Sequence, residues 1–306
     1  TSVGSIERIK KVAKRITRMR KTGLDIVVVV SAMAGETDKL LDMARQISPN
    51  AKRREVDLLL SSGERISSAL LSIALDNIGC PSISMTGRQI GLLTDGSHTR
   101  ARIKEIDTER ARRVLKKKHV IVVAGFQGIN EHGDVTTLGR GGSDTSAVAL
   151  AVALNAKQCE IYTDVDGVYT ADPNIVPNAR KMDRISYDEM LEMASLGAQV
   201  LQFRCVEFCK KYNMPLVVKS SLVDDSIGTL ICEEDTSMEQ PVVSGIMSDK
   251  NQAKITIKGV PDQPGIASKF FTGLADANLS VDMIIQNVSE EGHTDISFTL
   301  TKEDIN

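Results

Sequence analysis

The length, composition and charge of the chain limit its fold and its function. It has 306 residues, of which 42% are hydrophobic and 25% charged, and its formal net charge is −2. That length favours two domains, because single hydrophobic cores stop growing at about 250–300 residues. The near-neutral charge and the 3% aromatic content, with no Trp, argue against a nucleic-acid-binding surface. Apolar runs such as LDIVVVV at 24–30 are shorter than the roughly 20 residues that cross a bilayer, so we expect no membrane span.

Short runs rich in Val and Ile alternate with helical patterns along the first two thirds of the chain. Strands are predicted at 25–31, 81–86, 119–125, 159–164 and 214–220. Helices are predicted at 5–21, 36–47, 54–78, 107–118, 143–156 and 186–212. Because runs such as HVIVVAGF lack polar alternation, they suit a sheet that is covered on both faces. We therefore predict an α/β fold with an open, mostly parallel sheet sandwiched by helices.

The helix predicted from residue 186 carries its own start signal. Ser186 is followed three residues later by Glu189, which is the spacing of a capping box.

The pattern changes after residue 224. The segment DDSIGTLICEEDTSMEQP at 224–241 is acidic and interrupted by Gly and Pro. Beyond it, ITIKGV, a helical stretch around 265–277, LSVDMIIQNV and TDISFTLT form a β-α-β-β pattern of shorter elements. We therefore predict a first domain over 1–225, a linker over 226–245 and a second, smaller α+β domain over 246–306.

The cysteines do not form a recognisable metal or disulfide pattern. They are Cys80, Cys159, Cys205, Cys209 and Cys232. Cys205 and Cys209 lie one helical turn apart, but no second pair or nearby histidine completes a zinc site. We expect buried, reduced thiols in a cytoplasmic protein, and we predict no protein-built metal site.

The segment LGRGGSDTS at 138–146 places glycines directly before a predicted helix. Glycines let an anion approach the unpaired N–H groups of a helix start, where the helix dipole is positive. Ser143 or Asp144 would lie near the cap position, and the guanidinium of Arg140 suits a carboxylate or a phosphate. The segment fits an anion-binding loop, and an ordinary glycine loop with a capped helix is the alternative. The motif G-x-x-x-x-G-K-[ST] is absent, and no G-x-G-x-x-G follows the first strand, so a nucleotide would be held in another way.

A second polar segment, YTDVDGVYTADP at 162–173, ends a predicted strand. Ligands of parallel α/β sheets bind at the carboxyl ends of strands. Asp164, Asp166 and Asp172 could contact a ribose, a magnesium ion or its waters there, and Lys181 could neutralise a phosphate. A polar Asp-Gly turn is the alternative for any one of these residues.

The apolar helix LLSSGERISSALL at 59–71 carries Glu64 and Arg65 in its middle. Charged groups in so apolar a helix lower stability unless they face partners or a ligand. A solvent-facing position is the alternative.

Taken together, these residues closely resemble those of the aspartate kinases, which have the amino-acid kinase fold. The matching stretches run in order through the first 220 residues. They are TSVGS at 1–5, VVVVSAMAGETDKLL at 27–41, LLSSGERISSALL at 59–71, GFQGIN at 125–130, TTLGRGGSDTSA at 136–147, YTDVDGVYTADP at 162–173 and LGAQVL at 196–201. The combination is more specific than any single motif.

The resemblance implies a reaction and its cofactors. Aspartate kinases transfer the γ-phosphate of ATP, with Mg²⁺, to the side-chain carboxylate of L-aspartate. The product is 4-phospho-L-aspartate, the first intermediate towards lysine, threonine and methionine. Such a transfer depends on positioning and charge neutralisation, so glycine loops, Lys, Arg and Mg²⁺ suffice.

The resemblance also implies roles for individual residues. The catalytic residues would be Ser2, Arg140 and Asp144, with Ser2 close to the transferring phosphate. Aspartate would be held by Thr37, Glu64, Arg140, Gly141, Gly142 and Ser143, with Glu64 at the α-amino group. ATP would be held by Thr163, Asp164, Tyr169, Asp172 and Lys181.

The segment VPDQPGIASKFFTGLADANLSVDMIIQNVS at 260–289 resembles an ACT regulatory domain. The resemblance implies feedback inhibition by lysine and/or threonine, bound at an interface between paired ACT domains. It therefore implies a homo-oligomer, at least a dimer. The effector would contact Asp262, Gln263, Gly265, Ile266, Ala267, Gln286 and Asn287.

Three features depart from the family pattern. Aspartate kinases begin with a strand that ends Lys-Phe-Gly-Gly-Thr-Ser, and this sequence begins at that Thr. Most members carry two ACT domains, and here the first is unfinished, so we expect the sequence to be part of a longer polypeptide. Asn174 stands where an arginine often follows Asp-Pro, which removes one cationic contact to the nucleotide phosphates.

Two other functions stay open at this point. Another enzyme of the same fold would act on glutamate, acetylglutamate or a nucleotide monophosphate, and the SGER helix and the ACT segment oppose it. A catalytically silent amino-acid-sensing subunit is favoured by the absence of the N-terminal lysine from this sequence. The intact aspartate and ATP motifs oppose that second alternative.

Overall fold

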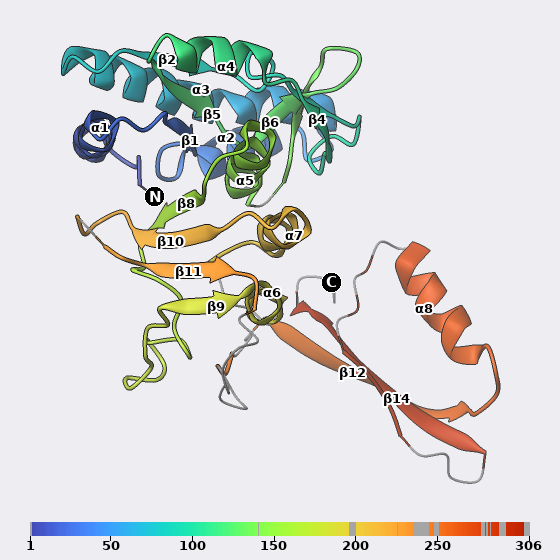
Figure 1. Ribbon diagram of the computed structural model, residues 1–306. Coiled ribbons are helices and arrows are strands. Elements are labelled where there is room, and N and C mark those ends of the chain that lie inside the picture. Colours follow the sequence, from blue (N-terminus) through green and yellow to red (C-terminus); the bar gives the residue numbers. More distant parts are fainter. Residues whose placement is uncertain are drawn as a thin grey trace. The chain divides into compact units, whose positions relative to one another are not determined.

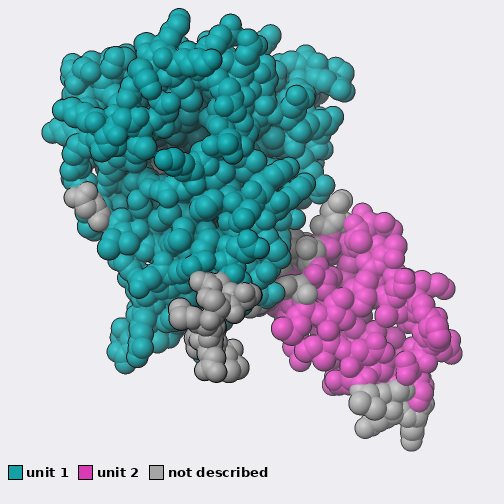
Figure 2. All heavy atoms as spheres, viewed as in Figure 1, with its two compact units in different colours: residues 1–247 teal, residues 248–306 magenta. Residues whose placement is uncertain are grey.

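The computed structural model describes residues 2–139, 141–195, 200–224, 226–234, 245–247, 251–276, 279, 281, 283–287 and 292–302. The chain forms two compact units, Thr1–Met247 and Ser248–Asn306, which are coloured separately in Figure 2. The first is an α/β unit and the second a small α+β unit, which confirms the predicted fold class.

A parallel sheet of three strands forms the centre of the first half of unit 1 (Figure 1). Its order is β1-β5-β2, with β1 at Val27–Val30, β5 at Val120–Ala124 and β2 at Ser82–Met85. The helices of this half are α1 (Ile6–Lys21), α2 (Glu36–Ile47), α3 (Arg53–Asn77) and α4 (Glu109–Lys116).

Strand β5 is apolar throughout because both of its faces are buried. Val120 and Val122 pack into a core with side chains of α1 and α3. Ile121 and Val123 point the other way and pack with Ala111 of α4. All five residues of β5 are buried, because alternate side chains of a strand face opposite sides of the sheet.

A four-stranded sheet forms the second half of unit 1. Its order is β8-β10-β11-β9, with β8 at Cys159–Thr163, β10 at Leu216–Ser220, β11 at Thr229–Cys232 and β9 at Arg184–Ser186. Helices α6 (Tyr187–Ser195) and α7 (Phe203–Tyr212) pack in the same core. Strands β8 and β10 are parallel, so their carboxyl ends lie at one edge.

Helix α5 (Gly142–Leu154) contributes to two of the cores of unit 1. Its Leu150 packs with the first sheet, and its Val148 packs with the second. This double burial explains why the sequence GSDTSAVALAVAL is apolar on all sides after its first turn. It also fixes the start of α5 at the junction between the two sheets.

A third sheet of short strands was not predicted. Its order is β4-β3-β6-β7, with β4 at Ile103–Ile106, β3 at Leu92–Thr94, β6 at Gln127–Ile129 and β7 at Val135–Thr137. Three of these strands have only three residues each, too few to show a period in the sequence.

The structure corrects two predicted boundaries. The single helix predicted over 186–212 is two helices, α6 and α7, which end and begin at Ser195 and Phe203. The predicted linker 226–245 contains β11, because the alternately buried TLIC at 229–232 pairs antiparallel with β10. The capping box is confirmed, since Glu189 Oε2 accepts the Ser186 N–H at 2.9 Å and Ser186 Oγ accepts the Glu189 N–H at 3.2 Å.

Helix α3 is long and apolar enough, by length and composition alone, to cross a membrane. Half of its most apolar window is buried inside the unit. Asp57, Ser61 and Glu64 are among its buried residues. Buried polar side chains of this kind are expected of a core helix that serves a site.

The described residues of unit 2 form an antiparallel sheet of order β12-β14-β13 and the helix α8. Its elements are β12 (Gln252–Pro261), α8 (Ile266–Asp276), β13 (Ile284–Gln286) and β14 (His293–Thr301). The predicted β-α-β-β order is present. Phe270 and Phe271 of α8 pack against Phe298 of β14, with ring centroids 5.5 Å and 5.8 Å away.

Candidate active site

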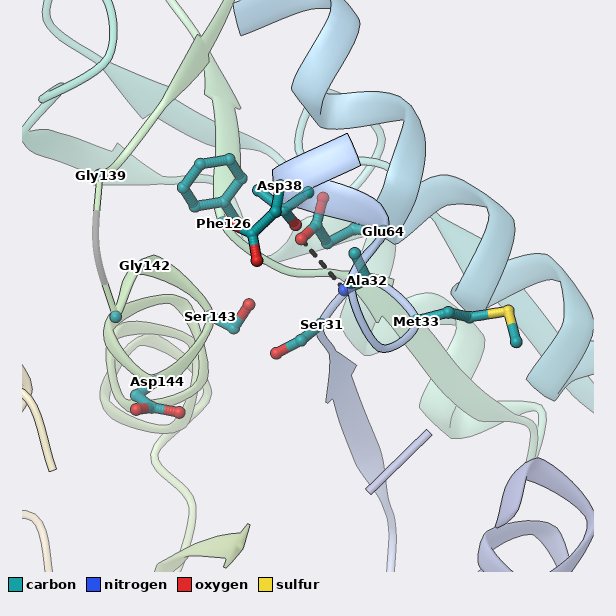
Figure 3. Close-up of a pocket in the computed structure, with 13 residues that line it drawn as sticks. Ser31, Ala32, Met33, Asp38, Glu64, Phe126, Gly139, Gly142, Ser143 and Asp144 are labelled. Carbon is teal, nitrogen blue, oxygen red and sulfur yellow. Dashed lines mark hydrogen bonds between the residues drawn. The ribbon is translucent and has the colours of Figure 1, made fainter. Parts of the chain in front are cut away.

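A cavity of about 350 Å³ lies where the loop after β1, helix α3 and the start of α5 meet (Figure 3). Its lining residues come from four separate parts of the sequence. They are Ser31, Ala32, Met33, Gly35, Thr37 and Asp38 after β1, Glu64 on α3, Phe126 after β5, and Gly139, Gly141, Gly142, Ser143 and Asp144 around the start of α5. The cavity is therefore built at the junction that α5 forms between the two sheets.

Glu64 is a buried carboxyl group in the wall of this cavity. Its Oε1 accepts the N–H of Ala32 at 3.1 Å (Figure 3). Its Oε2 is also buried and has no hydrogen-bond partner among the described residues. Burial raises the pKa of Glu64 to about 7, against smaller opposing effects of backbone hydrogen bonds that include the one from Ala32. A bound cation, such as an ammonium group, would satisfy the second oxygen and favour the charged form.

Gly63 explains how α3 comes so close to the loop after β1. A Cβ atom at position 63 would lie 2.8 Å from the Cβ of Ala32, closer than carbon atoms can pack. The glycine therefore lets the loop rest on the helix directly beside Glu64. This close packing explains why a glycine precedes Glu64 in the middle of an apolar helix.

The residue at the cap position of α5 differs from the predicted one, since it is Gly141 and not Ser143 or Asp144. Gly141 precedes α5 with a φ of +67°, a left-handed conformation that favours glycine, and no side chain caps the helix. Ser143 and Asp144 lie in the first turn and line the cavity. Burial raises the pKa of Asp144 to about 6. Two carboxyl groups with raised pKa values, Glu64 and Asp144, thus face the same cavity.

Phe126 lines the cavity, and its ring packs against Gly142 of the glycine loop. Its backbone φ is +67°, which is rare for a bulky residue. The Ser146 hydroxyl accepts its N–H at 3.1 Å, and its carbonyl accepts the N–H of Leu138 at 2.9 Å. These bonds from α5 and from the glycine loop hold the backbone of Phe126 in this conformation.

The residues predicted to bind ATP lie at the end of β8 and in the following hairpin, outside the cavity lining. Thr163 donates to Asp164 at 3.0 Å, and Tyr169 and Lys181 pair across the hairpin. The Asp172 carboxylate accepts the backbone N–H of Asn174 at 2.8 Å and its amide at 3.0 Å. Asp172 therefore stabilises its own turn in this structure.

Ser2 lies at the same strand end. Its hydroxyl donates to the carbonyl of Tyr162 at 2.8 Å, across 160 residues of sequence. The start of the chain is thus tied to β8, next to Thr163.

Comparison with known proteins decides the family. The amino acid kinase family profile matches residues 1–220, and the ACT domain profile matches residues 254–306. An aspartate kinase from Pseudomonas putida is 54% identical over 305 residues, which cover 99% of this chain and 74% of that protein. This chain belongs to the aspartate kinase family. Members of this family are ATP-dependent kinases that phosphorylate aspartate.

Solved structures of aspartate kinases have the same fold. That from Synechocystis is 48% identical with a TM-score of 0.70, and the match covers 99% of this chain and 51% of that one. E. coli aspartokinase III in complex with aspartate and ADP is 27% identical with a TM-score of 0.82, covering 99% and 77%. The complex of aspartokinase III with lysine and aspartate is 27% identical with a TM-score of 0.76, covering 98% and 77%.

In this aspartate kinase, most residues predicted to hold the acceptor lie around one cavity. They are Thr37, Glu64, Gly141, Gly142 and Ser143, and Asp144, which was predicted to be catalytic, lines the same cavity. Arg140 lies outside the described residues. Their individual roles stay predictions.

Sequence reasoning missed Ser31, Asp38 and Phe126 as lining residues. All three lie in stretches that carried the family resemblance, which was the available signal. The motif SAMAGETDKLL contains the first two, and GFQGIN contains the third.

The predicted effector residues lie at one end of the sheet of unit 2. Asp262 N–H donates to Gly292 at 2.9 Å, and Asn287 N–H donates to Asp295 at 3.0 Å, so both flank the start of β14. Gly265, with a φ of +92°, precedes α8, and Gln286 ends β13. The remaining predicted residues, Gln263, Ile266 and Ala267, belong to the same turn and helix start.

Proposed function

We propose that the chain transfers the γ-phosphate of ATP to the side-chain carboxylate of L-aspartate in the cavity around Glu64. The observation that carries the proposal is the buried Oε2 of Glu64, which has no hydrogen-bond partner among the described residues and belongs to a side chain that lines a small cavity. An α-ammonium group is the ligand group that such an oxygen lacks. The glycine loop on the other side of the cavity offers backbone N–H groups and the positive end of α5 to an anion.

The acceptor is held, in this proposal, at both of its ends. Glu64 binds the α-ammonium group, the hydroxyl of Thr37 donates a hydrogen bond to aspartate, and Arg140 binds a carboxylate. Gly141, Gly142 and Ser143 leave room beside α5 for the reacting carboxylate and the incoming phosphoryl group. ADP in the aspartokinase III complex supports ATP as the donor, and we place it at Thr163, Asp164, Tyr169, Asp172 and Lys181.

The reaction needs little acid–base chemistry. A carboxylate oxygen of aspartate forms the new bond to the γ-phosphorus, and the bond to the oxygen that bridges it to the β-phosphate breaks to release ADP. Because an ordinary aspartate side chain has a pKa near ~3.9, the nucleophile is already ionised at neutral pH. The catalytic work is then alignment and charge neutralisation, for which we assign Ser2 and Arg140 to the phosphoryl group and Asp144 to the organisation of the site.

Mg²⁺ fits this chemistry as a companion of the nucleotide. No three His, Cys, Asp or Glu side chains form a metal-binding group in the part of the chain that the structure describes. Kinases bind Mg²⁺ largely through nucleotide phosphates with one or two carboxylates, so such a group is not required. Asp164, at the end of β8, is the carboxylate we assign to the ion or its waters, and the ion would supply charge neutralisation.

The proposal also covers the regulatory effector, the oligomer and the cell compartment. Lysine in a complex of aspartokinase III supports lysine, threonine or both as effector at Asp262, Gln263 and the start of α8. We propose that two copies of unit 2 pair to form this site, so the protein is at least a dimer. The free cysteines, four of them buried, fit the reducing cytoplasm.

The reaction is tested with the full-length protein, ATP, Mg²⁺ and L-aspartate, with hydroxylamine to trap the acyl phosphate as aspartyl hydroxamate. Glu64→Gln is expected to raise the KM for aspartate roughly 10- to 100-fold, because a charge-assisted hydrogen bond contributes about 1.5–3 kcal/mol. The KM for ATP should stay near the wild-type value. Glu55→Gln is the matched control, since Glu55 is an exposed residue of the same helix.

Two results would contradict the proposal. A wild-type protein that forms no hydroxamate from aspartate, or forms it from L-glutamate instead, excludes this acceptor. A Glu64→Gln variant that loses affinity for ATP alone would show that Glu64 contacts the nucleotide and not aspartate.

A further inference from the structure

The glycine loop at 138–142 rests on a second loop that none of the roles above uses. Gly139 has a φ of +81°, and a Cβ atom there would lie 3.1 Å from the carbonyl oxygen of Thr99. Thr99 itself has a φ of +69°, and its N–H donates to the buried carboxylate of Asp57 at 3.0 Å. The loop at 99–101 is therefore held by α3, and it contacts the glycine loop at Gly139.

Arg204 joins these two loops to helix α7. Its Nη1 donates to the carbonyl of Leu138 at 2.9 Å, and its Nη2 donates to the carbonyl of Ala101 at 2.8 Å. Within the described residues, both acceptors are main-chain oxygens, so the arginine acts as a two-pronged donor rather than as an ion-pair partner. The rigid, planar guanidinium can span two carbonyls at once, whereas the ammonium of a lysine offers one compact donor group.

The start of α7 also covers the glycine loop. A Cβ atom at Gly141 would lie 1.8 Å from Cγ of Gln202, the residue directly before α7. Gln202 and Arg204 thus contact the glycine loop at both ends, at Gly141 and at Leu138. Helices α5 and α7 pack side by side in unit 1 (Figure 1).

Helix α7 is itself fixed to the sheet that carries the nucleotide loop. Cys205, Val206 and Cys209 are fully buried in the core that contains residues of β8 and β10. The shared core therefore links β8 and β10 to α7, and the hydrogen bond from Arg204 to Leu138 links α7 to the loop that lines the cavity.

We propose that Arg204 is a positioning residue for phosphoryl transfer, which fixes the acceptor-binding loop at 138–142 to α7 and so to the nucleotide-binding sheet. The role rests on the proposed function, because it matters only if this loop holds the acceptor. Reacting groups must be held within a fraction of an ångström, and a misplacement of about 1 Å can lower the rate roughly 100-fold. Arg204 reaches neither substrate site directly, and its effect is transmitted through the carbonyls of Leu138 and Ala101.

The test compares Arg204→Lys with the wild type in the full-length protein. The lysine keeps the positive charge but cannot bridge both carbonyls. We expect kcat/KM for aspartate to fall roughly 10- to 100-fold, with the KM for ATP within about twofold of wild type. Hydrogen–deuterium exchange should be faster in the peptide covering 136–142 and unchanged in α3.

Arg112→Lys is the matched control. Arg112 also donates from Nη2 to a main-chain carbonyl, that of Ala153 at 3.1 Å, but at the opposite end of α5 from the cavity. This variant should show wild-type kinetics and wild-type exchange at 136–142. Arg204→Met, which keeps the bulk and removes every donor, should exceed Arg204→Lys in both effects.

Several outcomes would overturn the role of Arg204. Wild-type kinetics in Arg204→Lys would do so. So would a parallel loss for ATP and aspartate with faster exchange throughout α7, which would indicate only a structural role. If the wild type does not phosphorylate aspartate, the proposed function fails. The hydrogen–deuterium exchange of the Arg204 variants then decides by itself whether Arg204 anchors the loop. Unchanged exchange at 136–142 then excludes the anchoring of the loop, and faster exchange confined to it supports that anchoring.

Discussion

Glu64 and Asp144 are carboxyl groups held where their charged forms are unfavourable. Burial is the main cause of both raised pKa values, about 7 and about 6. Neither has an ion-pair partner within the described parts of the chain. Such groups lower the stability of the free protein and favour binding of a cation. A cavity of this kind is completed by its ligands rather than by its own side chains.

The raised pKa of Glu64 leads to a prediction about pH. Below pH 7 the carboxyl group is mostly neutral and cannot pair with the ammonium group of aspartate, and above pH 7 it is ionised. We therefore expect kcat/KM for aspartate, which reports the free enzyme, to rise about tenfold between pH 6 and pH 8. Initial-rate assays of ADP release across this range measure it. Glu64→Gln should give a flat profile in this window, and a variant that keeps the wild-type slope would assign the titration to another group.

Individual residues differed in how far the sequence could identify them. Glu64 could be singled out because a charged side chain in an apolar helix needs a reason. Arg204 could not, because its acceptor at Leu138 is 66 residues away and no local pattern marks a contact between an arginine and a distant carbonyl. The left-handed backbone of Phe126 could not be predicted either, since its positive φ depends on tertiary contacts.

At the scale of elements, burial on both faces made some strands predictable. The apolar run of β5 is long and lacks alternation, and the capping box marked the start of α6. The three-residue strands β3, β6 and β7 contain Thr, Gln and Gly and show no period. Their pairing depends on partners far along the chain, so only the folded structure reveals it.

The contact between α3 and the loop after β1 gives a prediction for Gly63→Ala. Alanine in a helix interior normally stabilises by about 1 kcal/mol relative to glycine. Here the new methyl group would lie 2.8 Å from the Cβ of Ala32, and overpacking costs about 1–3 kcal/mol. We expect the clash to dominate, with a lower unfolding midpoint in thermal denaturation and a higher KM for aspartate.

Gly273→Ala in α8 is the control for this substitution. Gly273 is also helical, but a Cβ atom there would have nothing within 4 Å. We expect alanine at 273 to stabilise unit 2 by about 1 kcal/mol. If both variants stabilise the protein, the packing argument for Gly63 is wrong.

At the scale of the whole chain, the proposed chemistry and its proposed control lie in different units. Unit 1 contains the cavity and the loop proposed to bind ATP, and α5 contributes to two of its cores. Unit 2 has its own sheet and places the predicted effector residues at one end of β14. The division into an α/β part and a smaller α+β part could be predicted from the change in pattern after residue 224. The strand β11, inside the acidic stretch, could not.

The effector site gives a prediction at this scale. Asp262→Ala should raise the concentration of lysine or threonine needed for half-inhibition at least about tenfold, because it removes a charged hydrogen-bonding group. The uninhibited kcat should stay unchanged, since Asp262 belongs to unit 2. Lys254→Ala is the control, because Lys254 is exposed on β12 and pairs with Thr299, away from the predicted effector turn. Equal inhibition of both variants would exclude Asp262 from the effector site.

The left-handed backbone of Phe126 has a consequence for laboratory evolution. A bulky residue in that conformation costs about 1–3 kcal/mol, which glycine would recover. That gain is opposed by the loss of a half-buried ring that packs against Gly142 and lines the cavity, since truncating a buried phenylalanine costs about 3–5 kcal/mol. A screen for heat resistance should therefore keep Phe126, although its backbone conformation favours glycine. Directed evolution of this enzyme has little to gain at position 126, because the unfavourable backbone and the packed ring cannot be changed separately.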